Sequence, residues 1–239
     1  SLNFIFMMFI ISILVISNVF ADENNNTSDE ASSLEVEEIL VTANRTEQSI
    51  SDVSQAVQAL SGDDLQDLQI TDFEQMIDLI PGAVQNSSIS QGSNVYSIRG
   101  VASAETDGDA TIGYYLDNFA FSIPGRPYAP VTDIYDTERV EVLRGPSGTL
   151  YGLGSLGGTI KVITKDPVLG EFEGSFKATL ADIDDGDSSH TGDLMVNIPL
   201  SETAALRGVL SIKDIGGWAE IIPSNQTDGN PYDGITGRL

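Results

Sequence analysis

After Pro167, the hydrophobic and polar residues of this chain alternate with a period of two. In three segments, every second residue is apolar or glycine, and the residues between them are mostly polar. This period places alternate side chains on opposite faces of a β-strand. The segments therefore predict strands with one apolar and one polar face. Their apolar rows are Phe172, Gly174, Phe176, Ala178 and Leu180; then Leu194, Val196, Ile198 and Leu200; then Leu206, Gly208, Leu210 and Ile212.

Strands of this kind occur in two architectures. A transmembrane β-barrel turns the apolar row toward lipid and the polar row toward the lumen, whereas a soluble β-sandwich turns the apolar row toward its core. Residues 168–239 supply about four strands of roughly 10 residues, and the smallest membrane barrels have about eight. An open sheet in a bilayer would leave backbone groups unsatisfied. The barrel interpretation therefore predicts that the chain is a fragment whose remaining strands are missing.

From Ser54 to Pro167, the chain has the pattern of an α+β unit with short elements. Ser61 with Asp64 predicts one short helix, and Thr71-Asp72-Phe73-Glu74 is a capping box that predicts a second. Apolar residues then follow at helical spacing until Pro81-Gly82 ends the helix. We expect these residues in the core: Phe73, Met76, Ile77 and Ile80. Short apolar segments predict strands at residues 95–99, 112–116, 140–143 and 159–164, separated by long polar loops at residues 85–94, 103–109 and 119–132.

The first residues resemble an export signal. Residues 2–21 are apolar or uncharged and end in Val19-Phe20-Ala21, the form of a signal-peptidase site. A membrane anchor is the alternative, since the run approaches the roughly 20 residues that a bilayer requires. No basic flank follows it, and we favour a cleaved signal over residues 1–21. Residues 22–36 are acidic and polar without a basic residue, which predicts a flexible acidic leader.

The segment Ile39-Leu40-Val41-Thr42-Ala43 lies between this leader and the polar residues 44–47. Its composition favours a β-strand. Two interpretations fit the pattern equally well. The segment is either the first strand of the following domain, or a peptide kept available for the sheet edge of a partner protein.

Composition and charge exclude several classes of function. The 239 residues include 36 acidic and 11 basic side chains, for a net charge of −25, and the Lys and Arg residues are scattered. Phosphate backbones repel such a chain, so we expect no nucleic-acid partner. With no cysteine and a single histidine, His190, the chain has neither thiolate ligands nor a multi-histidine metal site. We expect no resident metal and no cofactor.

Three motifs that suggest other functions lack the context that each requires. Residues 152–157 match G-x-G-x-x-G but lead into a strand instead of a helix, so they predict no dinucleotide site. Residues 145–149 resemble a nucleophile elbow without its second glycine, and a catalytic triad would have to recruit His190 from an acidic loop. Residues 182–187 depart from the EF-hand pattern, which favours a solvated turn. We therefore predict that the protein is not an enzyme.

Four charged residues lie on or beside the predicted apolar strands: Arg99, Arg139, Glu141 and Arg144. Alternation places Arg139 and Glu141 on one face of their strand. Such residues are usually at the surface of a small core. The more specific interpretation is that they pair with carboxylates of a surrounding wall, because buried ion pairs fix geometry more than they stabilise.

Four motifs in a fixed order now point to a known family. They are Val95-Tyr96-Ser97-Ile98-Arg99-Gly100, then Gly113-Tyr114-Tyr115-Leu116-Asp117-Asn118, then residues 133–152, which contain Thr137-Glu138-Arg139-Val140-Glu141-Val142-Leu143-Arg144-Gly145-Pro146, and finally residues 157–165. In order and spacing they closely resemble the plug domain of TonB-dependent outer-membrane receptors. Asn118 departs from the pattern, because the family often has glycine there.

The resemblance implies a fold and a division of the chain. Residues 37–43 resemble a TonB box, residues 44–167 a plug domain with a small mixed β-sheet and short helices, and residues 168–239 the first antiparallel strands of the family's 22-stranded transmembrane β-barrel. The implied function is energy-coupled uptake of a scarce ligand, such as an iron–siderophore chelate, across the outer membrane of a Gram-negative bacterium. The alternative is a soluble periplasmic binding or structural protein with a β-rich C-terminal half.

The resemblance also implies roles for residues and partners. The TonB energy-transducing protein of the inner membrane would capture the box as an added strand, at Glu38, Ile39, Leu40, Val41, Thr42 and Ala43. Arg99, Arg139, Glu141 and Arg144 would hold the plug to the barrel wall. The long plug loops would face an extracellular small ligand, with Gln91, Asn94, Asp107, Arg126 and Tyr128 as candidate residues. Outer-membrane lipid would surround the strands.

Overall fold

The computed structural model describes residues 40–43, 45–70, 72–88, 94–103, 108–122, 125–129, 133–152, 154–182, 187–217 and 231–239. The chain divides into two compact units, Ser1–Glu37 and Glu38–Leu239, and all the described residues belong to the second. The expected signal, the acidic leader, Glu38 and Ile39 lie outside the described residues. Residues 183–186, in the acidic loop considered above as a calcium site, lie outside them too.

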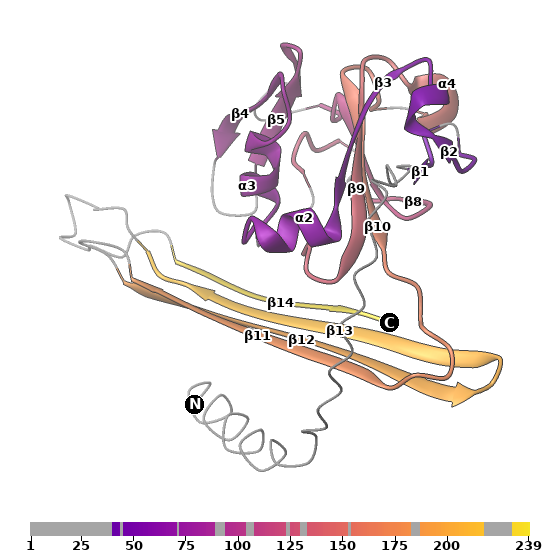
Figure 1. Cartoon of the computed structure of the whole chain (residues 1–239). Coiled ribbons are helices and arrows are strands. Elements are labelled where there is room, and N and C mark those ends of the chain that lie inside the picture. The colour runs from indigo at the N-terminus through magenta and orange to yellow at the C-terminus, as the bar shows by residue number, and fades with distance from the viewer. Residues whose placement is uncertain are drawn as a thin grey trace, which may run out of the picture. The chain divides into compact units, whose positions relative to one another are not determined.

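A five-stranded mixed sheet forms the centre of the α+β unit (Figure 1). Strand β9 lies between β3 and β10, and only the pair β7 and β10 is parallel. The strands predicted at residues 112–116, 140–143 and 159–164 correspond to β7, part of β9, and β10. In sheet order the strands are β3 (Ala56–Ser61), β9 (Thr137–Arg144), β10 (Gly158–Thr164), β7 (Ile112–Leu116) and β8 (Phe119–Ala120).

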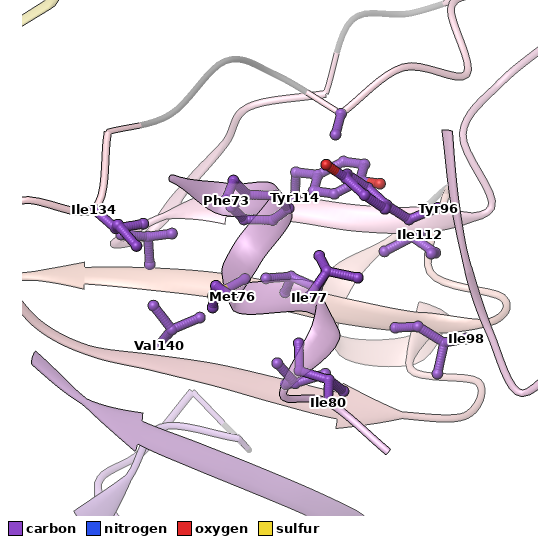
Figure 2. Packing of buried hydrophobic residues seen from close by; sticks show 14 of the residues in the cluster. Phe73, Met76, Ile77, Ile80, Tyr96, Ile98, Ile112, Tyr114, Ile134 and Val140 are labelled. Atoms are coloured by element: carbon purple, nitrogen blue, oxygen red, sulfur yellow. The ribbon is translucent and has the colours of Figure 1, made fainter. Parts of the chain in front are cut away.

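The main core lies on one face of this sheet. Helix α3 (Phe73–Asp78) turns Phe73, Met76 and Ile77 toward the apolar residues of the strands, as Figure 2 shows. The Phe73 ring centroid lies 5.6 Å from that of Tyr96 and 6.1 Å from that of Tyr114. The core predicted from helical spacing is therefore confirmed. Among the described residues, no helix has both the length and the apolar character needed to cross a membrane.

Helix α2 (Gly62–Asp67) and a three-stranded sheet complete this layer. The sheet has the order β4 (Ala83–Ser88), β5 (Asn94–Ile98), β6 (Val101–Ala102), and Figure 1 shows α3 beside β4 and β5. As predicted, Ser61 caps α2, because its hydroxyl accepts a hydrogen bond from the Asp64 amide at 3.0 Å.

Several predicted boundaries were wrong. The loop predicted from residue 119 begins later, because Phe119–Ala120 form β8. Helix α3 is capped by Asp72, one residue after the predicted cap, and the Asp72 carboxylate accepts from the Gln75 amide at 2.9 Å. Aspartate is as good an N-cap as threonine, so the motif alone did not fix the helix start. The loop predicted from Gln85 begins later, since β4 continues to Ser88. Its polar side chains concealed an edge strand that pairs with β5.

The opposite face of the five-stranded sheet carries a second, smaller cluster. It combines Val41 and Ala43 from the N-terminal segment with Tyr115, Leu143 and Tyr151. Four short elements build this side: β1 (Leu40–Val41), β2 (Gln48–Ser49), the 3-10 helix η1 (Ile50–Asp52) and α4 (Gly148–Tyr151). The N-terminal segment is therefore packed on the α+β unit.

Four antiparallel strands follow, here called the wall strands: β11 (Glu173–Asp182), β12 (Ser188–Ser201), β13 (Ala204–Ile215) and β14 (Tyr232–Arg238). Their number matches the estimate of about four. Paired residues share a face of the sheet, as with Phe176 and Leu194, or Leu194 and Leu210. The apolar rows predicted from the alternation thus form one continuous apolar face.

The burial of the wall strands is the reverse of that in a soluble protein. Large side chains of the apolar face are exposed, including Leu180 at 71%, Leu200 at 67% and Ile235 at 69%. Polar side chains of the other face are buried: Thr191, Asp193, Asn197, Arg207 and Ser211. This arrangement is typical of strands whose outer face contacts lipid.

Asn197, in β12, fixes the connection between the α+β unit and the wall strands. Its side-chain oxygen accepts from the Val168 amide at 3.0 Å, and its nitrogen donates to the carbonyls of Val168 at 2.9 Å and Glu171 at 2.8 Å. The Asn197 side chain is fully buried. One side chain therefore ties the connecting residues to the second wall strand.

Candidate functional site

The N-terminal segment Leu40–Ala43 forms a short strand outside the five-stranded sheet. Leu40 and Val41 pair with Ser49 and Gln48 in the hairpin of β1 and β2. Leu40 is 41% exposed, whereas Val41 and Ala43 are fully buried. The segment is thus neither a strand of the main sheet nor a free peptide, but a short strand seated on a face of the sheet.

The carboxylate of Glu141 accepts hydrogen bonds from Thr42. It accepts from the Thr42 amide at 2.9 Å and from the Thr42 hydroxyl at 3.2 and 3.1 Å. Glu141 lies in β9, between β3 and β10, and its charged side chain is fully buried. Strand alternation explains this position, because Val140 and Val142 point into the main core and Glu141 points to the other face.

Two cations make this buried carboxylate tolerable. Arg139 Nε lies 2.8 Å from Glu141 Oε1, and Lys161 Nζ lies 4.0 Å from Oε2. Lys161 also donates a hydrogen bond to the Thr42 hydroxyl. Burial lowers the pKa of Lys161, while the Glu141 charge acts in the opposite direction. An unpaired charge at this depth would be strongly unfavourable. The Glu141 charge is balanced by Arg139 and Lys161, and Thr42 adds hydrogen bonds to this group of charges.

Tyr151, at the end of α4, holds the same segment from the side. Its hydroxyl lies 3.0 Å from the Thr42 carbonyl and 2.9 Å from the Ala43 carbonyl, to which it donates. The Tyr115 hydroxyl donates to the Tyr151 carbonyl at 2.5 Å, and the two rings meet edge to face at 5.1 Å. Burial, followed by the Glu141 charge, raises the pKa of Tyr151 to about 12. The Tyr151 hydroxyl is therefore a donor at neutral pH.

We call Glu141, Lys161, Tyr115 and Tyr151 the dock. The amide of Thr42 donates to the dock and the carbonyl of Thr42 accepts from it. An added strand would use backbone groups of this kind. While Thr42 is seated, its amide and carbonyl are bonded to side chains of the dock, and its carbonyl also accepts from the Arg45 amide at 2.9 Å.

A second cluster joins the α+β unit to the wall strands. Arg207 of β13 binds Asp136 in a bidentate pair, at 2.8 Å from Nε and 2.7 Å from Nη2, and both side chains are more than nine-tenths buried. Arg238 of β14 donates to the carbonyls of Tyr135 at 2.7 Å and Asp136 at 3.0 Å. The Tyr135 hydroxyl lies 2.8 Å from the hydroxyl of Ser175 in β11. We call Tyr135, Asp136, Ser175, Arg207 and Arg238 the wall clasp.

Comparisons with known proteins identify this arrangement. Residues 49–159 match the family described as TonB-dependent Receptor Plug Domain. The chain is 30% identical over 180 residues to the metal-pseudopaline receptor of Pseudomonas aeruginosa strain UCBPP-PA14. The aligned region covers 74% of this chain and 23% of that receptor. The chain belongs to the TonB-dependent receptors.

Two further relatives agree. The pesticin receptor of Yersinia pestis is 31% identical over 108 residues, 45% of this chain and 16% of that receptor. The ferripyoverdine receptor of the outer membrane of Pseudomonas aeruginosa, solved with ferripyoverdine, superposes with a TM-score of 0.60 and 25% identity over 73% of this chain and 22% of that chain. The chain thus spans about a fifth of the length of these receptors. Its α+β unit is the plug domain, followed by antiparallel strands as in the family.

The four charged residues that the resemblance assigned to plug–barrel locking fall in different places. Arg139 and Glu141 meet at the dock, where Glu141 bonds within the plug. Arg99 lies at an exposed turn with a left-handed backbone, φ 52°. Arg144 ends β9, and its buried Nε has no hydrogen-bond partner among the described residues. Their contacts with a barrel stay a prediction.

The five candidate ligand-facing residues differ in their setting. Asn94 is buried at the start of β5, where its amide donates to Glu74 and its backbone carbonyl accepts from the Ala129 amide at 2.8 Å. Arg126 is exposed and Tyr128 is half-buried, so both remain open to a ligand. Gln91 and Asp107 lie outside the described residues.

Periodicity and motifs do not reveal Tyr151, Lys161 or the wall clasp as functional residues. Tyr151 and Lys161 lie within the family motifs at residues 133–152 and 157–165. Asp136 lies four residues before the strand predicted at residues 140–143, and Arg207 is a charged residue of a predicted polar row. A charged residue on the lumenal face of a predicted strand was therefore the available signal for the clasp.

Replacing Tyr151 with phenylalanine should loosen the seated segment. The change removes a donor shared by two carbonyls, and a hydrogen bond contributes about 0.5–1.5 kcal/mol. We expect a cysteine at Ala43, in the purified full-length receptor without ligand, to react with a thiol reagent about 10-fold faster in the Tyr151→Phe background. Tyr128→Phe is the matched control, because the Tyr128 hydroxyl makes no hydrogen bond within the described residues. Equal rates in the two backgrounds would show that the hydroxyl does not hold the segment.

Proposed function

We propose that this protein is the plug-bearing part of an outer-membrane receptor that takes up a scarce metal chelate with energy from the inner membrane. The observation that carries the proposal is the seating of Leu40–Ala43, a segment held on the plug chiefly through Thr42. A short strand with so few neighbours can leave its seat without unfolding the five-stranded sheet. It is therefore suited to capture by a partner's sheet edge.

The wall strands support a position in the outer membrane. Their exposed apolar face suits lipid. Their polar face carries the residues that contact the plug, such as Ser175 and Arg207. A plug held against the polar face of membrane-spanning strands would lie in the lumen of a barrel. The full-length receptor would supply the remaining strands.

A metal chelate is the proposed ligand class. Two of the relatives are named as receptors for metal-pseudopaline and for ferripyoverdine. The exposed Arg126 suits a chelate with net negative charge, and the half-buried Tyr128 offers an aromatic surface beside it. No covalent chemistry is required, because recognition and movement of the plug are sufficient for transport.

The mechanism follows from a competition for Thr42. Ligand bound on the extracellular side would favour plug conformations in which the dock holds the segment less tightly. The TonB protein would then pair with the released strand from the periplasm, and force on this strand would rearrange the plug and open a path. The ligand can shift the equilibrium only by its differential affinity for the two plug conformations.

The test is uptake of labelled ferric chelates by cells that express the full-length receptor, with and without the inner-membrane transducer. We expect surface binding in both strains and accumulation only where the transducer is present. A panel of chelates, with cobalamin for comparison, would identify the ligand class. Accumulation that is independent of the transducer would refute energy coupling, and cobalamin uptake without chelate uptake would refute the ligand class.

A further inference from the structure

Strand β9 connects the two clusters described above. It begins at Thr137, directly after Asp136 of the wall clasp, and it carries Glu141 of the dock. A pull on Thr42 therefore acts on the strand whose first end is bonded to the wall. The order in which these contacts separate decides which part of the plug moves.

The wall clasp is built to hold. Arg207 and Asp136 form a bidentate pair, the strongest geometry for an ion pair between side chains, and Arg207 also binds Glu173 at 3.1 Å. Arg238 donates to two successive backbone carbonyls of the same turn, those of Tyr135 and Asp136. The clasp thus reaches β11, β13 and β14 and fixes the turn through both its side chains and its carbonyls.

The backbone at the clasp shows the same constraint. Asp136 has a left-handed conformation, φ 55°, which aspartate tolerates better than most residues at some cost in energy. The next residue, Thr137, is buried and donates its hydroxyl to the Ile134 carbonyl at 2.9 Å. A hydrogen bond between Thr137 and Ile134 therefore stabilises the turn at the start of β9.

The seat of the N-terminal segment is less extensive. Segment β1 has two residues paired with β2, Leu40 and Val41. Strand β9 pairs with β10 between Thr137 and Arg144 and with β3 between Arg139 and Arg144. Freeing Thr42 requires the loss of the contacts to Glu141, Lys161 and Tyr151. Freeing β9 requires the loss of two ladders as well as the clasp.

We propose that the wall clasp is the fixed end of the plug during energised uptake, so that the dock opens between Thr42 and Glu141 while β9 stays in the sheet and on the wall. This inference rests on the proposed function, since it needs a pull on the segment. It assigns Asp136, Arg207 and Arg238 as positioning residues. They hold β9 in place while the transducer pulls the segment Leu40–Ala43 away from it.

The test uses single cysteines in the full-length receptor, in living cells with and without the transducer. Ala43→Cys reports on the seat and Val142→Cys reports on β9; both positions are fully buried. The 239 residues contain no cysteine of their own. With the clasp intact, we expect transducer-dependent labelling of the cysteine at position 43 and protection of the cysteine at position 142.

Asp136→Asn should change this result. Asparagine keeps the shape and tolerates the left-handed backbone, but it loses the charge opposite Arg207. We expect the Val142→Cys receptor to be labelled at least about 10-fold faster in energised cells. Arg207→Gln should act alike, and the double variant should add little to either single change. Glu202→Gln, at the exposed turn between β12 and β13, is the matched control.

The outcomes separate the claims. If the cysteine at position 43 is labelled equally with and without the transducer, the proposed function fails. If that labelling depends on the transducer but position 142 is labelled as fast with the clasp intact, β9 leaves with the segment and the fixed end is refuted. If Asp136→Asn exposes position 142 without the transducer, the clasp only stabilises the plug, which also overturns the proposal.

Discussion

A receptor with proline at Thr42 should bind its ligand at the cell surface and yet fail to accumulate it. Proline has no amide hydrogen, so the bond from the Thr42 amide to Glu141 at 2.9 Å is lost. The Thr42 hydroxyl, which bonds to both Glu141 and Lys161, is lost as well. The segment should leave the dock more readily, but a strand that contains proline is a poor partner for another sheet edge.

Thr42→Val is the matched control. Valine keeps the backbone amide and the branched shape of threonine but removes the hydroxyl bonds. We expect uptake of the labelled chelate to fall at least about 100-fold in Thr42→Pro, on the scale expected for a removed strand contact, and to stay within about twofold of the native rate in Thr42→Val. Ligand binding at low temperature should be nearly equal in both. Native uptake by Thr42→Pro would exclude this segment as the coupling strand.

Removing the dock carboxylate should have the largest effect on stability. Glu141→Ala would leave the buried Lys161 without its carboxylate partner and would leave Arg139 paired with Glu138 alone. Breaking a buried ion pair costs about 3–5 kcal/mol. It would also remove the acceptor of the Thr42 amide. We therefore expect a plug that unfolds at a lower temperature and a segment that is exposed without ligand.

Glu141→Gln separates the two contributions. Glutamine can still accept from Thr42 but carries no charge, so the segment should be held more weakly while the sheet keeps its packing. Scanning calorimetry of the purified full-length receptor measures the stability, and labelling of a cysteine at Ala43 measures the release. If Glu141→Ala and the native protein unfold at the same temperature, the carboxylate is not needed to compensate the cations.

The sequence predicted those features that depend on neighbouring residues. The helical spacing of Phe73, Met76 and Ile77 and the alternation through Leu194 and Leu210 are set by local geometry, and the structure confirms both. The dock and the clasp depend on residues far apart in the chain. Thr42 and Glu141 are separated by 99 positions, and Asp136 and Arg207 by 71. Periodicity contains no information about such pairs.

Motif resemblance supplied part of the missing information. It named Glu141 for contacts with the barrel wall, which stay a prediction, and the structure adds a hydrogen bond from the Thr42 amide to this carboxylate within the plug. The sequence also left two interpretations of the N-terminal segment, because its partners are distant in the chain. A five-residue apolar stretch shows that a strand is favoured, but its partners are the side chains of β9, β10 and α4, which only the fold brings together.

The bonds of Asn197 have a practical meaning for engineering. Because this one amide holds both Val168 and Glu171, the joint after the plug is completed by a residue of the second wall strand. A chimera spliced at Pro167, with the plug of one receptor and the barrel of another, would inherit a joint whose stabilising amide comes from the barrel parent. Such hybrids should assemble well only when the barrel parent has asparagine at the equivalent position.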